Sequence, residues 1–235
     1  MQRTRNRRRL ALLGILALAF SVTAGLAVAD TAAAKKKKNK NPGGTVDITM
    51  PVNAQVPDAS GTFPNVKNGV LTSTINVPSA KPFIGTVIRD VNVTVQTTGS
   101  TPGTGTPPVG GSASQLDFRV TAPNGTTSWL FGAEAGSSVS GASIGPLTID
   151  DETPTQLTRT PPADSTQLGP PFNGTAQPDP FTSLGPAALW IMDGGPATGA
   201  WTLRVYDVIA PSPVETSVLN SWRITVVAGK PFRVK

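Results

Sequence analysis

Two segments near the C-terminal end constrain the fold most, because each alternates apolar and polar side chains around a tryptophan. They are residues 199–207, Gly-Ala-Trp-Thr-Leu-Arg-Val-Tyr-Asp, and residues 219–226, Leu-Asn-Ser-Trp-Arg-Ile-Thr-Val. A period of two residues predicts a half-buried β-strand. The predicted apolar faces are Trp201, Leu203 and Val205 in the first segment and Trp222, Ile224 and Val226 in the second. A buried tryptophan removes on the order of 200 Å² from water, so we expect these strands to dominate the core.

The rest of the chain also predicts strands separated by turns. The 235 residues include 24 glycines and 23 prolines, and no segment after the first thirty residues keeps a 3.6-residue period. Further strands are expected at residues 70–77, 87–97, 116–121, 128–131, 146–149 and 187–191, with Val87, Val91, Val93 and Val95 sharing one face. Many short strands with Gly/Pro turns indicate an all-β sandwich or barrel with almost no helix.

Residues 1–29 are predicted to be a secretory signal peptide. Five arginines precede an apolar run from Leu10, and the small residues Ala27-Val28-Ala29 form a cleavage site before Asp30. The competing interpretation is a retained membrane anchor, because about 20 apolar residues can span a bilayer. Cleavage predicts a secreted, extracellular protein of the bacterial cell envelope or medium, without a stable membrane span.

Residues 30–61 are predicted to be a lysine-rich linker followed by an extra edge strand. Lysines occupy positions 35–38 and 40, and Val46–Met50 then alternates in the manner of a strand. The lysines are either a solvated spacer or an adhesive for an anionic wall polymer or membrane. From Asn41 onward acidic residues outnumber basic ones, so no nucleic-acid partner is expected, despite a short basic tail at residues 229–235.

The chain has no cysteine and no histidine. Disulfides, thiol catalysis and cysteine zinc sites are therefore excluded, as is the usual base of a serine protease. The sequence also has no Gly-x-Ser-x-Gly or Ser-x-x-Lys motif. We expect a protein that is not an enzyme.

The two tryptophan segments also carry a family resemblance. Residues 199–207 followed by Leu219-Asn220-Ser221-Trp222 resemble the end of the P domain (P/Homo B domain) that accompanies subtilisin-like proprotein convertases. Further segments match in the family's order: residues 68–69, 72–75, 91–95, 123–127 and 149–152. The resemblance spans residues 62–228 and implies a jelly-roll-like, galactose-binding-like β-sandwich with long Gly/Pro loops.

The resemblance implies a non-catalytic module that packs against a protease domain and stabilises it. The family's serine endopeptidase activity belongs to a catalytic domain, for which the residues before position 62 are too few. We therefore expect any partner to be a separate extracellular protease or a cell-surface component. The alternative function is a cell-surface or carbohydrate-binding jelly roll that uses its long loops. An exposed Trp129 or Trp190 would favour that alternative, although both are expected in the core.

The resemblance also implies calcium binding, with Asp150, Asp151 and Asp207 as ligands. Loop carboxylates supply the oxygens that Ca²⁺ prefers. Gln115 replaces the family's aspartate, and Ser217-Val218 replaces its glycine. A second interpretation makes Asp150 and Asp151 acceptors of backbone N–H groups at a strand end. Consecutive positions let at most two of Asp150, Asp151 and Glu152 converge, and nothing in the sequence supports a glycosidase pair.

Overall fold

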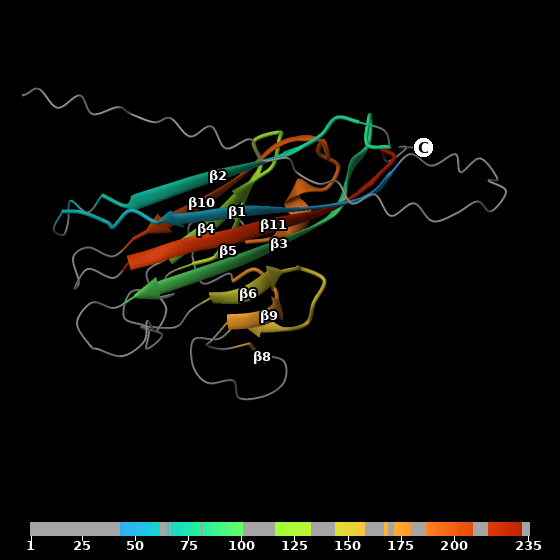
Figure 1. Ribbon diagram of the computed structural model, residues 1–235. Helices are drawn as coiled ribbons and strands as arrows, with labels where there is room; N and C mark the ends of the chain where they lie inside the picture. The colour runs from blue at the N-terminus through green and yellow to red at the C-terminus, as the bar shows by residue number, and fades with distance from the viewer. Residues whose placement is uncertain are drawn as a thin grey trace, which may run out of the picture. The chain divides into compact units, whose positions relative to one another are not determined.

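The structure is a computed structural model that describes one compact unit of the chain, Asn39–Lys235. The described residues are 43–61, 65, 67–80, 82–100, 116–132, 144–157, 167–168, 172–179, 187–208 and 216–231. The predicted signal peptide, the lysine run, Gln115 and residues 232–235 lie outside them. Two β-sheets form a sandwich, which confirms the predicted all-β fold class (Figure 1).

The larger sheet has five strands in the order β1-β11-β3-β6-β9. Their bounds are β1 (Gly44–Gln55), β11 (Thr216–Gly229), β3 (Val87–Ser100), β6 (Ile144–Ile149) and β9 (Phe172–Ala176). Neighbours are antiparallel except for the parallel pair β6 and β9. β1 lies at the sheet edge and is longer than the predicted segment 46–50, and Figure 1 shows it beside β11, with β3 on the other side of β11. β9 was not predicted.

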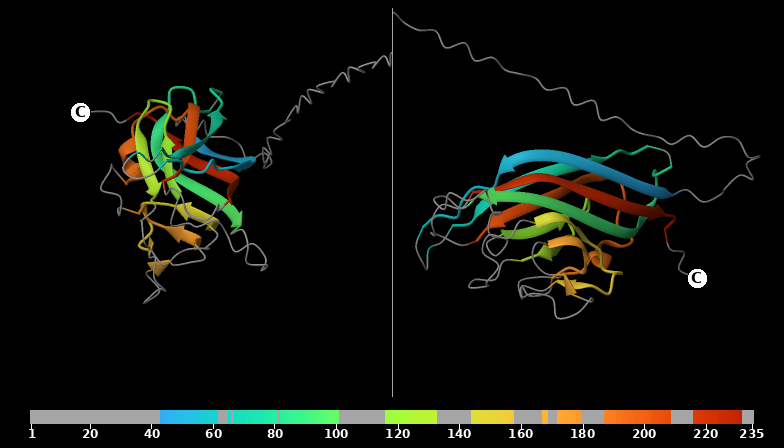
Figure 2. Two further views of the ribbon diagram at one scale, coloured as in Figure 1. Left: turned by 90° about the vertical axis from the view of Figure 1, so that its left-hand side faces the viewer. Right: turned by 60° about the horizontal axis from the view of Figure 1, so that its bottom comes forward.

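The smaller sheet has four strands in the order β2-β10-β4-β5. Their bounds are β2 (Gly69–Val77), β10 (Gly199–Asp207), β4 (Leu116–Thr121) and β5 (Thr127–Phe131). Outside both sheets, β7 (Gln156–Leu157) pairs with β8 (Gln167–Leu168). The turn between β4 and β5 follows Pro123, and Gly125 adopts a φ of 87° that glycine tolerates best. The two layers of the sandwich are visible in Figure 2.

The core lies between the sheets and contains the predicted apolar faces of β10 and β11. Trp201 is 0% and Trp222 is 1% exposed, so the alternation in both strands is confirmed. The indole Nε1–H of Trp222 donates to Ser73 Oγ at 2.9 Å, which joins β11 to β2 in the opposite sheet. Phe172 on β9 is also buried and packs edge-on against Phe131 at a centroid distance of 5.1 Å.

The predicted phase of β3 is wrong at its start. Ile88, and not Val87, is fully buried in line with Val91. The β3–β11 register pairs Ile88 with Ala228 and Asp90 with Val227, which leaves Arg89 as an extra residue on β3. Such a β-bulge reverses the alternation on one side of it.

Residues 187–191 do not form the predicted strand. Most of this segment belongs to a 3₁₀ turn, η1 (Leu189–Met192). Its residues Leu189 and Met192, three positions apart, are both buried. Trp190 between them is 65% exposed, so the prediction that it is a core residue is wrong, whereas Trp129 is buried as predicted. None of the helical structure in the described residues is long and apolar enough to cross a membrane.

Candidate functional site

Strand pairing gathers carboxylates at one end of the five-stranded sheet. β3 and β6 run antiparallel with Val93 opposite Ile149, so residues 150–152 leave β6 alongside residues 90–92. The chain turns at Asp151 and Glu152 instead of continuing as a strand. The turn removes the strict alternation of faces, and both side chains can approach Asp90.

Carboxylate oxygens of Asp90, Asp151 and Glu152 all lie within 4.8 Å of one another. We call these three residues, with the adjoining Asp150, the acidic site. Asp150 Oδ1 accepts the backbone N–H of Glu152 at 2.9 Å, and Asp151 Oδ2 accepts the backbone N–H of Trp190 at 2.6 Å. One oxygen each of Asp150 and Asp151 is thus the strand-end acceptor that the second interpretation expected, and each carboxylate has a second oxygen.

The donor set of the acidic site fits a hard cation such as Ca²⁺. It consists of oxygens, which Ca²⁺ prefers at a coordination number of six to eight. Among the described residues, Asp90 Oδ1 and Asn92 Oδ1 are buried atoms without a hydrogen-bond partner. A buried polar atom normally has a partner, and both oxygens belong to the β3 segment that lines this site.

The negative charges of the carboxylates in the acidic site repel one another, and this repulsion contributes to the raised pKa values of Glu152 and Asp90. Burial raises the pKa of Glu152 to about 7, together with its hydrogen bond to Asp150 and the charge of Asp90. Burial also raises the pKa of Asp90, and the charge of Asp150 adds to the effect. The pKa of Asp193, in the turn after η1, is raised by burial and by the charge of Asp151. A bound cation would remove this repulsion.

Asp207 does not lie in the acidic site. It ends β10 opposite Leu116 and Gly69. The other end of β10 follows the turn at Gly194 and Gly195, whose backbone forms hydrogen bonds with that of Ile88, two residues before Asp90. A nine-residue strand spans about 26 Å at roughly 3.3 Å per residue. The structure therefore brings Asp150 and Asp151 together and places Asp207 at the opposite end of the sandwich.

Asp90 and Glu152 were missed as candidate ligands in the sequence. Asp90 precedes Val91 in a strand that is otherwise rich in valine, and a charged residue in such a strand is the local signal that could have drawn attention to it. Its approach to Asp151 depends on the β3–β6 register, which the sequence alone did not supply.

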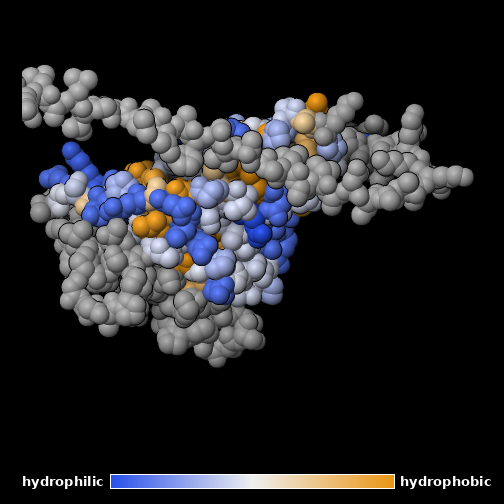
Figure 3. Space-filling view, in the orientation of Figure 1, coloured by the Kyte–Doolittle hydropathy of each residue, from blue (hydrophilic) through white to orange (hydrophobic). Residues whose placement is uncertain are grey.

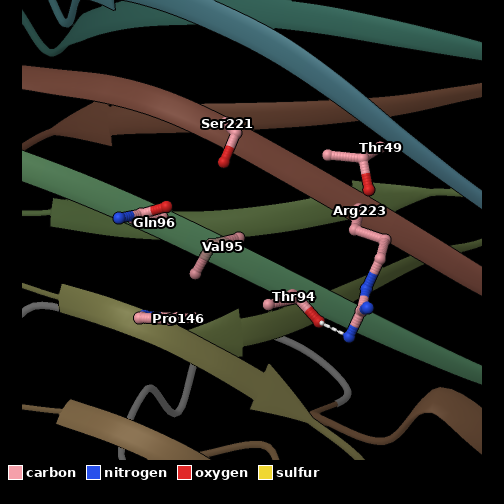
Figure 4. Close-up of a pocket in the computed structure, with 7 residues that line it drawn as sticks. All are labelled: Thr49, Thr94, Val95, Gln96, Pro146, Ser221 and Arg223. Carbon is pink, nitrogen blue, oxygen red and sulfur yellow. Dashed lines mark hydrogen bonds between the residues drawn. The ribbon is translucent and has the colours of Figure 1, made fainter.

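A second feature is a hollow of about 200 Å³ on the outer face of the five-stranded sheet. It crosses four strands and is lined by Thr49, Thr94, Val95, Gln96, Pro146, Ser221 and Arg223 (Figure 4). Arg223 Nη2 donates to Thr94 Oγ1 at 3.2 Å, and Thr94 Oγ1 lies 2.9 Å from Thr148 Oγ1. We call this the sheet-face hollow. Figure 3 shows hydrophilic and neutral colours over much of this side of the molecule.

The outer face of the four-stranded sheet is built differently. Arg119 stacks between two rings, with its guanidinium carbon 3.6 Å from the centroid of Trp129 and 4.3 Å from that of Tyr206. Its Nη2 also lies 3.9 Å from Asp117 Oδ2. Arg119 is therefore enclosed by its neighbours, whereas Arg223 lines a hollow.

Comparisons with known proteins give only distant similarities. The sequence matches no protein-family model and no curated protein. The serine protease of Aeromonas sobria in complex with a chaperone resembles the chain with 15% identity and a TM-score of 0.35, over 80% of this chain and 27% of that chain. The structure of that protease gives 15% identity and a TM-score of 0.34, over 78% of this chain and 27% of that chain. The present chain thus spans about 27% of the length of these proteins, and similarity at this level carries no argument about function.

Proposed function

We propose that the protein is a secreted, non-catalytic β-sandwich module of the P-domain type that binds calcium at the acidic site. The single observation that supports calcium best is the approach of carboxylate oxygens from Asp90, Asp151 and Glu152 to within 4.8 Å. The resemblance of residues 62–228 to the P domain supports the module, and the absence of histidine from the sequence supports a role other than hydrolysis.

Bound calcium would join segments that are far apart in the chain. Asp90 belongs to β3, and Asp151 and Glu152 follow β6. Asp151 also contacts η1, because its Oδ2 accepts the backbone N–H of Trp190. A cation that binds only the folded state stabilises it by about 2.7 kcal/mol at a hundredfold excess over Kd. In calcium-rich extracellular fluid the module would then be more rigid at the end where these segments meet.

The partner we propose is a separate extracellular protease or a cell-surface component. The module would stabilise such a partner by packing against it, in the way the family resemblance implies. The proposal predicts that the purified protein itself hydrolyses neither peptides nor esters. Activity that persists through repurification and follows the protein would contradict it.

Isothermal titration with CaCl₂ tests the proposed site on the secreted protein, whose mature N-terminus is first determined by mass spectrometry. We expect an N-terminus at Asp30 and a Kd on the order of 10⁻⁴–10⁻³ M, as for other extracellular calcium sites. Asp151→Asn should remove most of the binding because it takes one charge from the site. Asp58→Asn is the matched control, since Asp58 is exposed and is not one of the acidic-site residues. An absence of binding at several millimolar Ca²⁺ would reject the calcium site.

A further inference from the structure

We propose that the sheet-face hollow binds a neutral saccharide chain. The hollow lies on the outer face of the five-stranded sheet and is lined by side chains from β1, β11, β3 and β6. None of its lining residues is a carboxylate of the acidic site. The proposal therefore stands or falls independently of calcium binding.

The hollow coincides with a row of register shifts. The pairs shift between Pro51 and Ala54 in β1, between Leu219 and Ser221 in β11, and between Val95 and Thr97 in β3. In β1 the irregularity includes Asn53, whose φ of 49° is unusual for a residue other than glycine. β-Bulges bend a strand and redirect side chains, and they are common beside functional sites. Three register shifts thus lie at one level of the sheet, and the residues that line the hollow lie beside them.

The side chains in the hollow match the hydrogen bonding of sugar hydroxyls. Each sugar hydroxyl both donates and accepts, and so do the amide of Gln96 and the hydroxyls of Thr49 and Ser221. Figure 4 shows these three side chains on neighbouring strands β3, β1 and β11. Pro146 adds an exposed apolar ring at the β6 side, which can contact the C–H groups of a sugar ring.

The charge of the hollow favours a neutral ligand over an anionic one. Arg223 is the cation in its lining, and its Nε lies 3.7 Å from Asp47 Oδ1, so a carboxylate already balances the guanidinium. The Arg223 side chain is 42% exposed, and a guanidinium carries five N–H groups, one of which Nη2 donates to Thr94 Oγ1. A sugar hydroxyl could accept from another N–H at the exposed end of the guanidinium without adding charge.

The position of the hollow favours a saccharide over a peptide. Extended peptides gain much of their affinity from main-chain hydrogen bonds to the edge of a sheet. At the hollow the main chains of β11 and β3 are paired with strands on both sides. The ligand therefore meets side chains of the sheet face, which suits a molecule recognised through hydroxyl groups.

Affinity electrophoresis of the full-length secreted protein tests the proposal. Native gels contain barley β-glucan, xylan, galactomannan or soluble starch as neutral probes, or heparin as an anionic probe. We expect at least one neutral polysaccharide to retard the protein. Gln96→Ala should weaken that retardation about tenfold in Kd, as expected when a pair of hydrogen bonds is lost. Ser221→Phe should abolish it by filling the hollow.

Matched controls lie on the outer face of the opposite sheet. Thr74 on β2 and Arg204 on β10 are exposed, so Thr74→Val and Arg204→Gln should retain full retardation. Melting curves confirm that all variants are folded. Failure of all four neutral probes, or retardation by heparin alone, would overturn the proposal. It would also be overturned if Trp190→Ala lost binding while Gln96→Ala and Ser221→Phe kept it, because the site would then be the exposed tryptophan.

Discussion

The two ends of the sandwich hold carboxylates in opposite ways. At one end Asp90, Asp151 and Glu152 face one another, and the pKa values of Asp90 and Glu152 are raised. At the other end Asp207 is 5% exposed and makes polar interactions within the fold. The first end gathers negative charge near the surface, and at the second end Asp207 is buried among its own partners.

This difference separates a candidate ligand site from a structural carboxylate. A buried acid is retained when the fold supplies partners for it. Carboxylates whose negative charges mainly repel one another weaken the folded state. A bound cation is the simplest reason for the fold to hold them together. Both ends contain residues that the sequence proposed as calcium ligands, so the same residue type has two roles in one domain.

The largest expected effect concerns the core that joins the two ends. Trp201 on β10 is fully buried, so Trp201→Ala should lower the free energy of unfolding by about 3–5 kcal/mol. Arg204→Ala, on the exposed face of the same strand, should cost much less. Urea unfolding monitored by circular dichroism measures both. Similar urea midpoints for Trp201→Ala and the wild type would show that the two ends do not depend on a shared core for their stability.

A smaller effect should separate the two kinds of carboxylate directly. Asp207→Ala should destabilise the protein by about 1–3 kcal/mol in chelator, because the substitution removes the polar interaction of a buried carboxylate. Asp151→Asn should be neutral or stabilising in chelator, since it relieves repulsion and its amide oxygen can still accept the N–H of Trp190. Several millimolar Ca²⁺ should raise the Tm of Asp207→Ala but not that of Asp151→Asn. If Ca²⁺ raised the Tm of Asp151→Asn but not that of Asp207→Ala, the cation site would lie at the Asp207 end.

The smallest effect is a dependence on pH at the acidic site. The folded state raises the pKa of Glu152 from 4.5 to about 7, so the folded protein binds this proton more tightly than the unfolded chain does. Glu152 therefore contributes its full stabilisation below pH 4.5, and this contribution is lost as the pH rises toward 7. In chelator, the Tm of the wild type relative to Glu152→Gln should fall by a few degrees across this range. A constant difference between the two proteins would contradict the repulsion described here.

The strands with strong alternation could be predicted from the sequence. In β10 and β11 the tryptophans and β-branched residues fix both the strand and its buried face. The buried face at the start of β3 could not be predicted, because the bulge at Arg89 depends on the register of β3 with β11. β9 could not be predicted either, since Phe172–Ala176 is short and forms a strand by pairing with β6.

The acidic site was predictable only in part for a similar reason. The run Asp150-Asp151-Glu152 is visible in the sequence, and it does lie at the end of a strand. Asp90 joins it through the pairing of β3 with β6, across a separation that no local pattern spans. Asp207 belongs to a motif near the C-terminal end, and the direction of β10 carries it to the far end of the sandwich.

Terbium luminescence tests the central claim most directly, because Tb³⁺ is a luminescent substitute for Ca²⁺. The backbone nitrogen of Trp190 lies 2.6 Å from Asp151 Oδ2, so we expect its indole to transfer excitation to an ion in the acidic site. We expect tryptophan-sensitised emission that Ca²⁺ displaces, that Asp151→Asn abolishes and that Trp190→Phe strongly reduces. Emission that is absent, or that is unchanged in Asp151→Asn, would contradict a cation site at this end of the sandwich.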